Sequence, residues 1–229
     1  MGRKLGIGAG PVNRYDGYMG ETLRIVTTGL HGGHPALDFV NTLDWRDRSA
    51  AEGGPEEMLV SYDALLACWR RLGIVGTAAE GELKRQAGRQ PAQAAAVLAE
   101  AVELREALHR MAQAVRQGKA ARPADIEVLN RSLLRYPEAR VIANMSSGAR
   151  LGWKAHGDGL RLGSPLGAMA RLGAGLLVSA EPASIRCCAG PGCGWLFHDT
   201  SPNKRRRWCS MESCGNRAKA RRHYQKHKV

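Results

Sequence analysis

Residues 187–214 read CCAGPGCGWLFHDTSPNKRRRWCSMESC, and they contain five of the six cysteines of the 229-residue chain. Four of these cysteines form two pairs with the spacing Cys188-x4-Cys193-x15-Cys209-x4-Cys214. Zinc binds four thiolates in a tetrahedron, and two close pairs on separate turns can supply them from a short chain. A segment of about 44 residues buries too little apolar surface to fold unaided, so a metal cross-link would also stabilise it. The pattern predicts one structural Zn2+ ion per chain.

The identity of the first ligand is open because Cys187 directly precedes Cys188. The equal spacing within the two pairs favours Cys188. Histidine is an alternative donor, since sites with three cysteines and one histidine are common, and His198, His223 and His227 lie in the same segment. Solvent exposure or phosphate contact is the simpler interpretation of these histidines. Reduced cysteines without a metal are a further alternative, whereas disulfides are least expected in a reducing compartment.

The same end of the chain carries most of the positive charge. The whole sequence has a formal net charge of +13. From residue 186 to the C-terminus, eleven Lys and Arg residues stand against Asp199 and Glu212, which gives +9 for this segment and +4 for the remainder. Such a concentrated cationic segment indicates a polyanionic partner. That partner is most simply a nucleic acid or an anionic membrane surface, and a charge that only keeps the chain soluble is the alternative.

Two basic elements in this segment are candidates for contact with DNA. Residues 215–227 contain no helix breaker and predict a helix that begins at the last cysteine, with cations on most of its girth. The loop between the two cysteine pairs supplies the second element. Bracing of the metal site is an equal alternative for Asn216. The predicted DNA-binding residues are Lys204, Arg205, Arg206, Arg207, Asn216, Arg217, Lys219, Arg221 and Arg222.

Helical patterns dominate the first 180 residues. The longest predicted helix begins at Pro91 and ends near Gln117, with apolar residues at helical spacing. Residues 23–27 predict a short strand, and residues 139–155 predict a hairpin with its turn at 146–148. Further helices are predicted from Pro35, from capping residues Ser61 and Thr77, from Pro123 and from Pro165. The predicted fold class is therefore mainly α with a few short strands (α+β).

Four polar residues near the start of the helical region are candidates for ligand binding. Asp38, Asn41 and Thr42 interrupt an apolar segment, and Arg46 follows shortly after them. Buried polar side chains need hydrogen-bond partners, so these residues either brace the backbone or bind a small molecule. Bracing is the favoured interpretation. A small-molecule effector at these residues is the alternative.

Membrane and enzyme functions find little support in the sequence. The longest apolar run, residues 166–180, is broken by Arg171 and is shorter than the roughly 20 residues that span a bilayer. No signal-peptide pattern is present, so we expect a cytoplasmic protein without membrane attachment. Walker-type phosphate loops, HExxH and G-x-S-x-G motifs are absent, and four thiolates would leave zinc no open position for an activated water. We therefore do not expect an enzyme.

Several short motifs in the C-terminal segment resemble the CGNR zinc-finger family. They are CGWLF at 193–197, DTS at 199–201, RRWCSM at 206–211 and CGNRAK at 214–219. The stretch LDFVNTL at 37–43 is similar to the ABATE domain that is usually found ahead of that finger. The resemblance implies Cys188, Cys193, Cys209 and Cys214 as metal ligands. It also implies a bacterial, stress-induced transcription regulator, so the expected polyanionic partner is double-stranded DNA.

Together these observations predict three parts: a flexible leader at 1–20, an ABATE-like helical sensing or dimerisation domain at 21–181, and a CGNR-type zinc finger ending in a basic helix at 182–229. A single small finger reads few base pairs, so a homodimer is expected to lengthen the recognised site. One rival hypothesis is an RNA-associated basic zinc-finger protein. Another is a metabolite-binding protein or enzyme with a purely structural zinc module.

Overall fold

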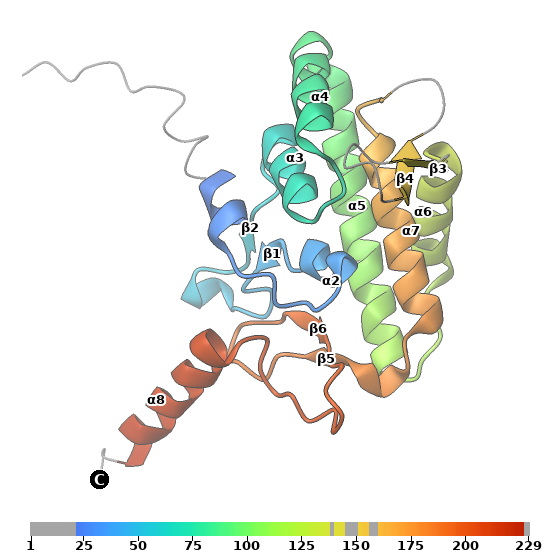
Figure 1. The fold of residues 1–229 in the computed structure, drawn as a ribbon. Helices are drawn as coiled ribbons and strands as arrows, with labels where there is room; N and C mark the ends of the chain where they lie inside the picture. The colour runs from blue at the N-terminus through green and yellow to red at the C-terminus, as the bar shows by residue number, and fades with distance from the viewer. Residues whose placement is uncertain (1–21, 138–139, 145–150, 156–159, 227–229) are drawn as a thin grey trace, which may run out of the picture.

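The computed structural model describes residues 22–137, 140–144, 151–155 and 160–226. The predicted leader lies outside these residues. Figure 1 shows a body of helices with the C-terminal segment packed against one end and its last helix projecting from it. The predicted fold class, mainly helical with a few short strands, is confirmed. No helix in the described ranges is both long and apolar enough to cross a membrane.

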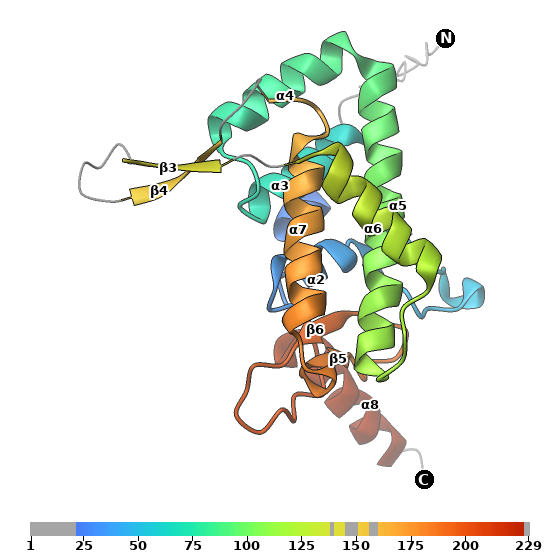
Figure 2. The same ribbon diagram turned by 90° about the vertical axis from the view of Figure 1, so that its right-hand side faces the viewer.

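Three helices form the centre of the body: α5 (Pro91–Arg116), α6 (Pro123–Arg135) and α7 (Ser164–Ser179). Each has a proline in its first turn, where the missing N–H would have no helical partner. They run side by side (Figure 2). The close approach of α7 to α5 depends on Gly173, because a Cβ there would lie 2.5 Å from Leu108 Cδ2.

Three further helices cover this centre: α2 (Pro35–Val40), α3 (Tyr62–Arg71) and α4 (Thr77–Arg89). The predicted cap of α3 is confirmed, since Ser61 Oγ accepts a hydrogen bond from the Ala64 amide at 3.1 Å. The predicted cap at Thr77 is wrong by one residue, because Gly76 is the N-cap and Thr77 is already helical. Helix boundaries are thus well predicted where proline or a capping hydroxyl marks them.

The predicted strand at 23–27 is wrong, because residues 22–27 form a helix. Ile25 is buried, and its carbonyl accepts a hydrogen bond from the Arg71 guanidinium on α3. The Thr27 hydroxyl donates to the Leu23 carbonyl one helical turn earlier at 2.7 Å. A contact with a distant helix therefore overrides the strand preference of the local β-branched residues.

The helical core contains a charged group that the sequence did not reveal. Arg105 of α5 is 2% exposed, and its guanidinium binds both carboxylate oxygens of Glu57 at 2.6 and 2.7 Å. Glu57 lies in β2 (Glu56–Glu57), which pairs with β1 (Leu43–Asp44). A buried charge must be paired, so Arg105 fixes this small sheet on α5. The largest fully buried apolar side chains of the same core are Trp69, Phe39, Leu37, Leu65, Leu66, Leu83, Leu104, Leu162, Leu166 and Met169.

The predicted hairpin is confirmed as β3 (Arg140–Asn144) and β4 (Leu151–Ala155). The strands are antiparallel, with Ile142 opposite Trp153. The predicted turn at 146–148 lies outside the described residues. The hairpin projects away from the helices (Figure 2).

The C-terminal segment begins with β5 (Ile185–Cys187) and β6 (Leu196–His198), an antiparallel pair. Short turns of helix occur at Ala50–Glu52, Pro182–Ser184 and Met211–Gly215, and the last of these leads into α8 (Asn216–Lys226). Ile185 and Leu196 belong to the core of the helical body. The two segments on either side of the boundary predicted at 181/182 therefore share a core. The domain boundary itself stays a prediction.

The other edge of β6 is bonded to the helical body. The side-chain amide of Asn41 donates to the Leu196 carbonyl at 2.9 Å, and its oxygen accepts from the Leu196 amide at 3.0 Å. The His198 amide donates to the Gly32 carbonyl at 2.7 Å. Asn41 thus replaces a strand partner for β6.

Because Leu196 fills the shared core, we expect Leu196→Ala to lower the free energy of unfolding of the whole chain by about 2–5 kcal/mol. Leu134→Ala is the matched control, since Leu134 is 81% exposed and such a change should stay within about 0.5 kcal/mol. Urea unfolding followed by far-UV circular dichroism measures both. A native unfolding midpoint for Leu196→Ala would contradict the shared core.

Asp125, in the first turn of α6, should make a contribution to the free energy of unfolding that depends on pH. It is 2% exposed, and hydrogen bonds from Arg122 and Arg110 hold its pKa at about 2, below the usual 3.8. Because the folded-state pKa is the lower one, this contribution is complete above about pH 4 and is lost as the pH falls towards 2.

We therefore expect Asp125→Asn to cost about 1–2 kcal/mol at pH 6, a value reduced for the exposure of both arginines. The difference from the wild type should shrink between pH 4 and pH 3 in urea unfolding. Glu103→Gln is the control, because Glu103 pairs with Arg131 where both side chains are 48% exposed. A difference that does not change with pH would refute this role of Asp125.

Candidate metal centre and nucleic-acid interface

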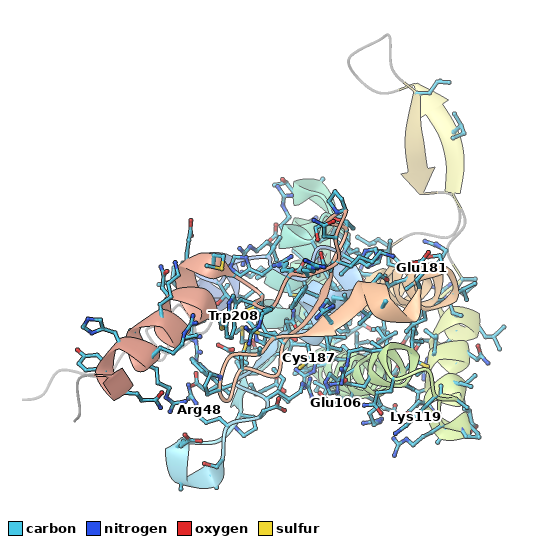
Figure 3. All side chains as sticks on the ribbon, turned by 90° about the horizontal axis from the view of Figure 1, so that it is seen from below. Arg48, Glu106, Lys119, Glu181, Cys187 and Trp208 are labelled. Carbon is cyan, nitrogen blue, oxygen red and sulfur yellow. The ribbon has the colours of Figure 1, made fainter. Side chains whose placement is uncertain are left out.

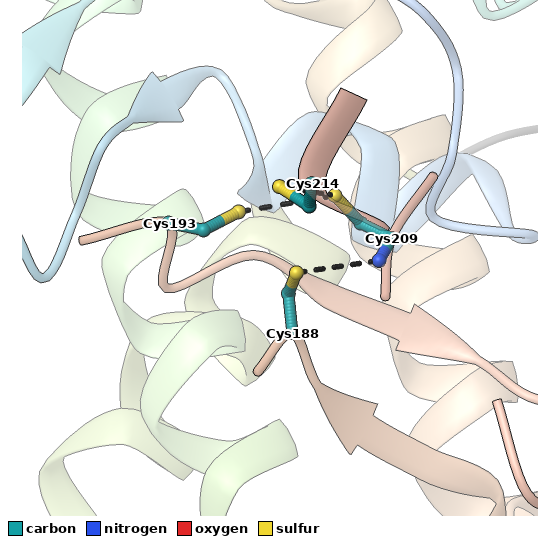
Figure 4. Close-up of side chains that lie close together, drawn as sticks. All are labelled: Cys188, Cys193, Cys209 and Cys214. Carbon is teal, nitrogen blue, oxygen red and sulfur yellow. Dashed lines mark hydrogen bonds between the residues drawn. The ribbon is translucent and has the colours of Figure 1, made fainter. Parts of the chain in front are cut away.

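The structure brings together the four cysteines predicted as metal ligands. Cys188, Cys193, Cys209 and Cys214 are buried, and all four Sγ atoms lie within 4.8 Å of one another. The Sγ atom of Cys209 is 3.8 Å from that of Cys193 and 3.6 Å from that of Cys214. A tetrahedral ion with metal–sulfur distances of about 2.3 Å separates its sulfurs by about 3.8 Å. The four side chains, which converge on one point in Figure 4, therefore fit a four-thiolate metal site.

Strand alternation selects Cys188 over Cys187. Successive side chains of a strand point to opposite faces of the sheet. Cys187, at the end of β5, packs against the core of the helical body, and burial raises the pKa of its thiol. Cys188 then faces the other way and joins the sulfur cluster. Hydrogen bonds with the Cys193 and Cys209 side chains lower the pKa of the Cys188 thiol.

Hydrogen-bond donors surround the sulfurs. The amides of Gly190 and Cys209 lie 3.4 and 3.3 Å from Cys188 Sγ, and the Arg217 guanidinium lies 2.9 Å from Cys214 Sγ. Donors and a positive charge favour thiolates over thiols and orient them for a metal. These contacts are typical of the outer shell of a thiolate metal site.

Two glycines of the metal module permit close contacts, one with the sulfurs and one with the helical body. A Cβ on Gly190 would lie 3.0 Å from Cys214 Sγ, so a larger residue would crowd the sulfurs. Gly194 has a φ of +66°, and a Cβ there would lie 2.8 Å from the Cβ of Arg46 in the helical body. Glycine at this position therefore lets the metal module pack closely on the body. Neither glycine was predicted to support the site, although their positions inside a cysteine-rich turn are a usable signal.

No histidine in the described part of the chain belongs to the sulfur group. The backbone amide of His198 bonds to the helical body, as described above, and His223 lies on α8. His227 lies outside the described residues. The set of four cysteines is therefore the donor set that the geometry supports.

The cations of the loop between the cysteine pairs have different surroundings. Arg206 donates to the carbonyls of Trp208 and His31 at 2.9 and 3.0 Å, and it stacks on the Phe197 ring at 4.4 Å. It therefore holds the loop on the body, although it was predicted to contact DNA. Lys204 forms an ion pair with Glu181. Arg205 and Arg207 are exposed.

The predicted DNA-contact residues of α8 are of two kinds: some bond within the protein, and others are exposed. Asn216 donates to the Glu212 carbonyl at 3.1 Å, which fits the bracing alternative. Arg217 bonds to Cys214 as described and stacks on the Trp45 ring at 4.5 Å. Lys219, Arg221 and Arg222 are exposed, and no ion pair with a carboxylate involves them within the described residues. These last three cations are available to a partner.

The four residues proposed for ligand binding are hydrogen-bonded within the protein. Asp38 accepts from the Gly32 amide at 2.7 Å, and Thr42 donates to the Phe39 carbonyl at 2.7 Å. Asn41 binds β6, as described above. Arg46 forms a two-pronged ion pair with Glu106, with N···O distances of 2.7 and 3.0 Å. The cavity beside Asp38, Asn41 and Thr42 has a volume of about 30 Å³, far below the roughly 300–1,000 Å³ of typical small-molecule sites. These contacts favour bracing.

The fold and the site together define a helical protein with a C-terminal zinc-finger-type metal-binding module. The model of the CGNR zinc finger matches residues 184–227, and the model of ABATE, described as "Putative stress-induced transcription regulator", matches residues 33–180. The ABATE match covers more than half of the sequence, and the chain belongs to the ABATE family. The order of the two segments is the predicted one. No curated protein matches the chain.

The adjacent cysteines provide a matched test of the metal site. We expect Cys188→Ser to reduce the bound metal well below one ion per chain, because it removes one of four ligands. Cys187→Ser should retain one ion per chain. Metal analysis of the purified chains and the thiolate absorption of a cobalt-substituted sample measure both effects. Equal metal content in the two variants would refute the assignment.

Proposed function

We propose that this protein is a zinc-dependent transcription regulator whose helix α8 contacts double-stranded DNA. The observation that carries the proposal is the charge and exposure of α8. Its sequence, NRAKARRHYQK, contains five Lys and Arg residues and no acidic residue. Residues 219–225 are all exposed. The family description as a transcription regulator supports the same function.

The attachment of α8 favours a defined contact over diffuse attraction. The helix packs mainly on the turn at Met211–Gly215, which contains Cys214, so the metal site fixes the helix at its first residue. The rest of the helix projects from the body (Figure 1). An α-helix fits the major groove of B-DNA, where arginine side chains can reach base edges and phosphates.

The cations divide into contact residues and supporting residues. On this proposal, Lys219, Arg221 and Arg222 contact DNA, and Arg205 and Arg207 add phosphate contacts. Arg206, Asn216 and Arg217 hold the metal module in shape. With five phosphate contacts, we expect the affinity for DNA to fall by a factor of about 500 between 50 and 200 mM salt.

The remaining parts of the proposal concern the metal and the helical body. The four thiolates suit Zn2+, and a closed shell gives the ion a structural role and no catalytic one. We propose a non-enzymatic, cytoplasmic protein that binds DNA as a homodimer, because a single finger reads few base pairs. The helical body would supply the dimer contact or respond to a small-molecule effector.

A pair of charge-matched double variants tests the proposal. We expect Arg221→Ala/Arg222→Ala to weaken binding of a fluorescent random 24-bp duplex about 50-fold at 100 mM salt and to reduce the salt slope by about 2. Lys84→Ala/Arg89→Ala removes the same charge from exposed positions on α4, at the other end of the molecule (Figure 1), and should bind like the wild type. Anisotropy titrations at several salt concentrations measure both.

Equal losses in the two double variants would show non-specific attraction and contradict a defined interface on α8. Selection from random duplexes then tests sequence preference. Displacement of a selected duplex by an unrelated RNA hairpin at equal concentration would favour an RNA-associated function instead.

A further inference from the structure

A cationic groove lies between α8 and the helical body. Its volume is about 670 Å³, and its walls come from residues 45–52, from the turn at 189–192 and from α8. Figure 3 shows Arg48 and Trp208 beside α8. The charged and aromatic residues that line it are Trp45, Arg48, Glu52, Arg207, Trp208, Arg217, Arg221 and Arg222.

The groove is strongly positive and is built from both family segments. Five arginines and one glutamate line it, which gives a net charge of +4. Arg48 belongs to the segment that matches ABATE, whereas the other four arginines belong to the zinc finger. A concave surface of one sign focuses its field and attracts an anion.

Trp45 organises two of these arginines. The guanidinium of Arg48 lies 3.9 Å from the centre of the Trp45 ring, and that of Arg217 lies 4.5 Å from it. A guanidinium that stacks on an aromatic ring keeps its N–H groups directed outward in its own plane, where they can bind phosphate oxygens. Trp45 has a φ of +52°, a left-handed conformation that is uncommon for a bulky residue. This indole therefore joins one arginine from each segment.

Arg48 is also held by an ion pair. Its guanidinium binds a Glu56 carboxylate oxygen at 2.7 Å, and Glu56 in turn pairs with Arg24. Arg48 is 20% exposed, so it loses little freedom when it binds a ligand. Its position is set before any partner arrives.

We propose that this groove holds the phosphodiester backbone of one nucleic-acid strand, with Arg48 as a contact supplied by the ABATE segment. The inference rests on the proposed function and extends its interface beyond the finger. A volume of about 670 Å³ is too small for a duplex but is in the range of sites for small groups. Arg221 and Arg222 line the groove and also lie on exposed α8, so a strand in the groove is continuous with one that α8 contacts.

Arg48→Ala and Arg24→Ala in the full chain provide the test. Each variant removes one ion-pair partner of Glu56, but only Arg48 lines the groove. With the random 24-bp duplex at 100 mM salt, we expect Arg48→Ala to bind about eightfold more weakly and to reduce the salt slope by about 1. Arg24→Ala should bind like the wild type. Metal content and thermal unfolding of both variants show that the chain is folded.

Trp45 acts as a positioning residue and needs a separate readout. Trp45→Ala should remove the contribution of Arg48, so Trp45→Ala/Arg48→Ala should bind no more weakly than Trp45→Ala. Trp45→Phe keeps an aromatic face and should restore most of the affinity. Independent, additive losses would overturn the role assigned to the stack.

The outcomes separate this inference from the proposed function. Wild-type affinity in Arg48→Ala, together with the loss expected for Arg221→Ala/Arg222→Ala, would overturn the inference and leave the function standing. A wild-type chain that binds no duplex at 50 mM salt would overturn both. Displacement of the duplex by micromolar inorganic phosphate at constant ionic strength would identify a pocket for a free anion and overturn the strand contact.

Discussion

Strand β6 closes two cores at once, and the arrangement of the rest of the molecule depends on this. Its alternating side chains place Leu196 in the core of the helical body, while Trp195 and Phe197 pack around the four sulfurs. One backbone edge of β6 pairs with β5, and the other edge bonds to Asn41 and Gly32. The metal module is therefore packed against the helical body and not loosely tethered to it, because β6 contributes side chains to both cores. The direction of α8 relative to the helices is therefore fixed by packing.

Helix content and the metal ligands were predictable because each leaves a local mark in the sequence. Pro91, Pro123 and Pro165 each lie in the first turn of a helix, and Ser61 caps one as expected. The strand predicted at 23–27 failed because its helix is stabilised by Arg71, which is distant in the sequence. The burial of Arg105 beside Glu57 was equally unpredictable, since a charged residue within a helix normally faces solvent. Contacts between remote segments were the part that sequence patterns could not supply.

The candidate site shows the same division at the level of single side chains. Equal cysteine spacing favoured Cys188 as the first metal ligand, and the structure gives the physical reason. Cys187 is the last residue of β5, and its side chain packs against the core of the helical body. Counting cations located the basic segment but could not distinguish the cations that contact the protein from those available to DNA. Arg206 was assigned to DNA, yet three carbonyl oxygens and an aromatic ring surround its guanidinium. Arg48 was missed because it lies about 140 residues before the finger, and only the fold brings it beside α8.

Metal binding and nucleic-acid binding are linked through Arg217 if α8 contacts DNA as proposed. This side chain touches Cys214 Sγ and Trp45, so it joins a metal ligand, the groove and the start of α8. Loss of the metal would free Cys214 and with it the first turn of the helix, so DNA affinity would fall although no residue that touches DNA had changed. Coupling between two binding equilibria is reciprocal. Bound DNA would therefore tighten the hold on the metal by the same factor by which the metal tightens the hold on DNA.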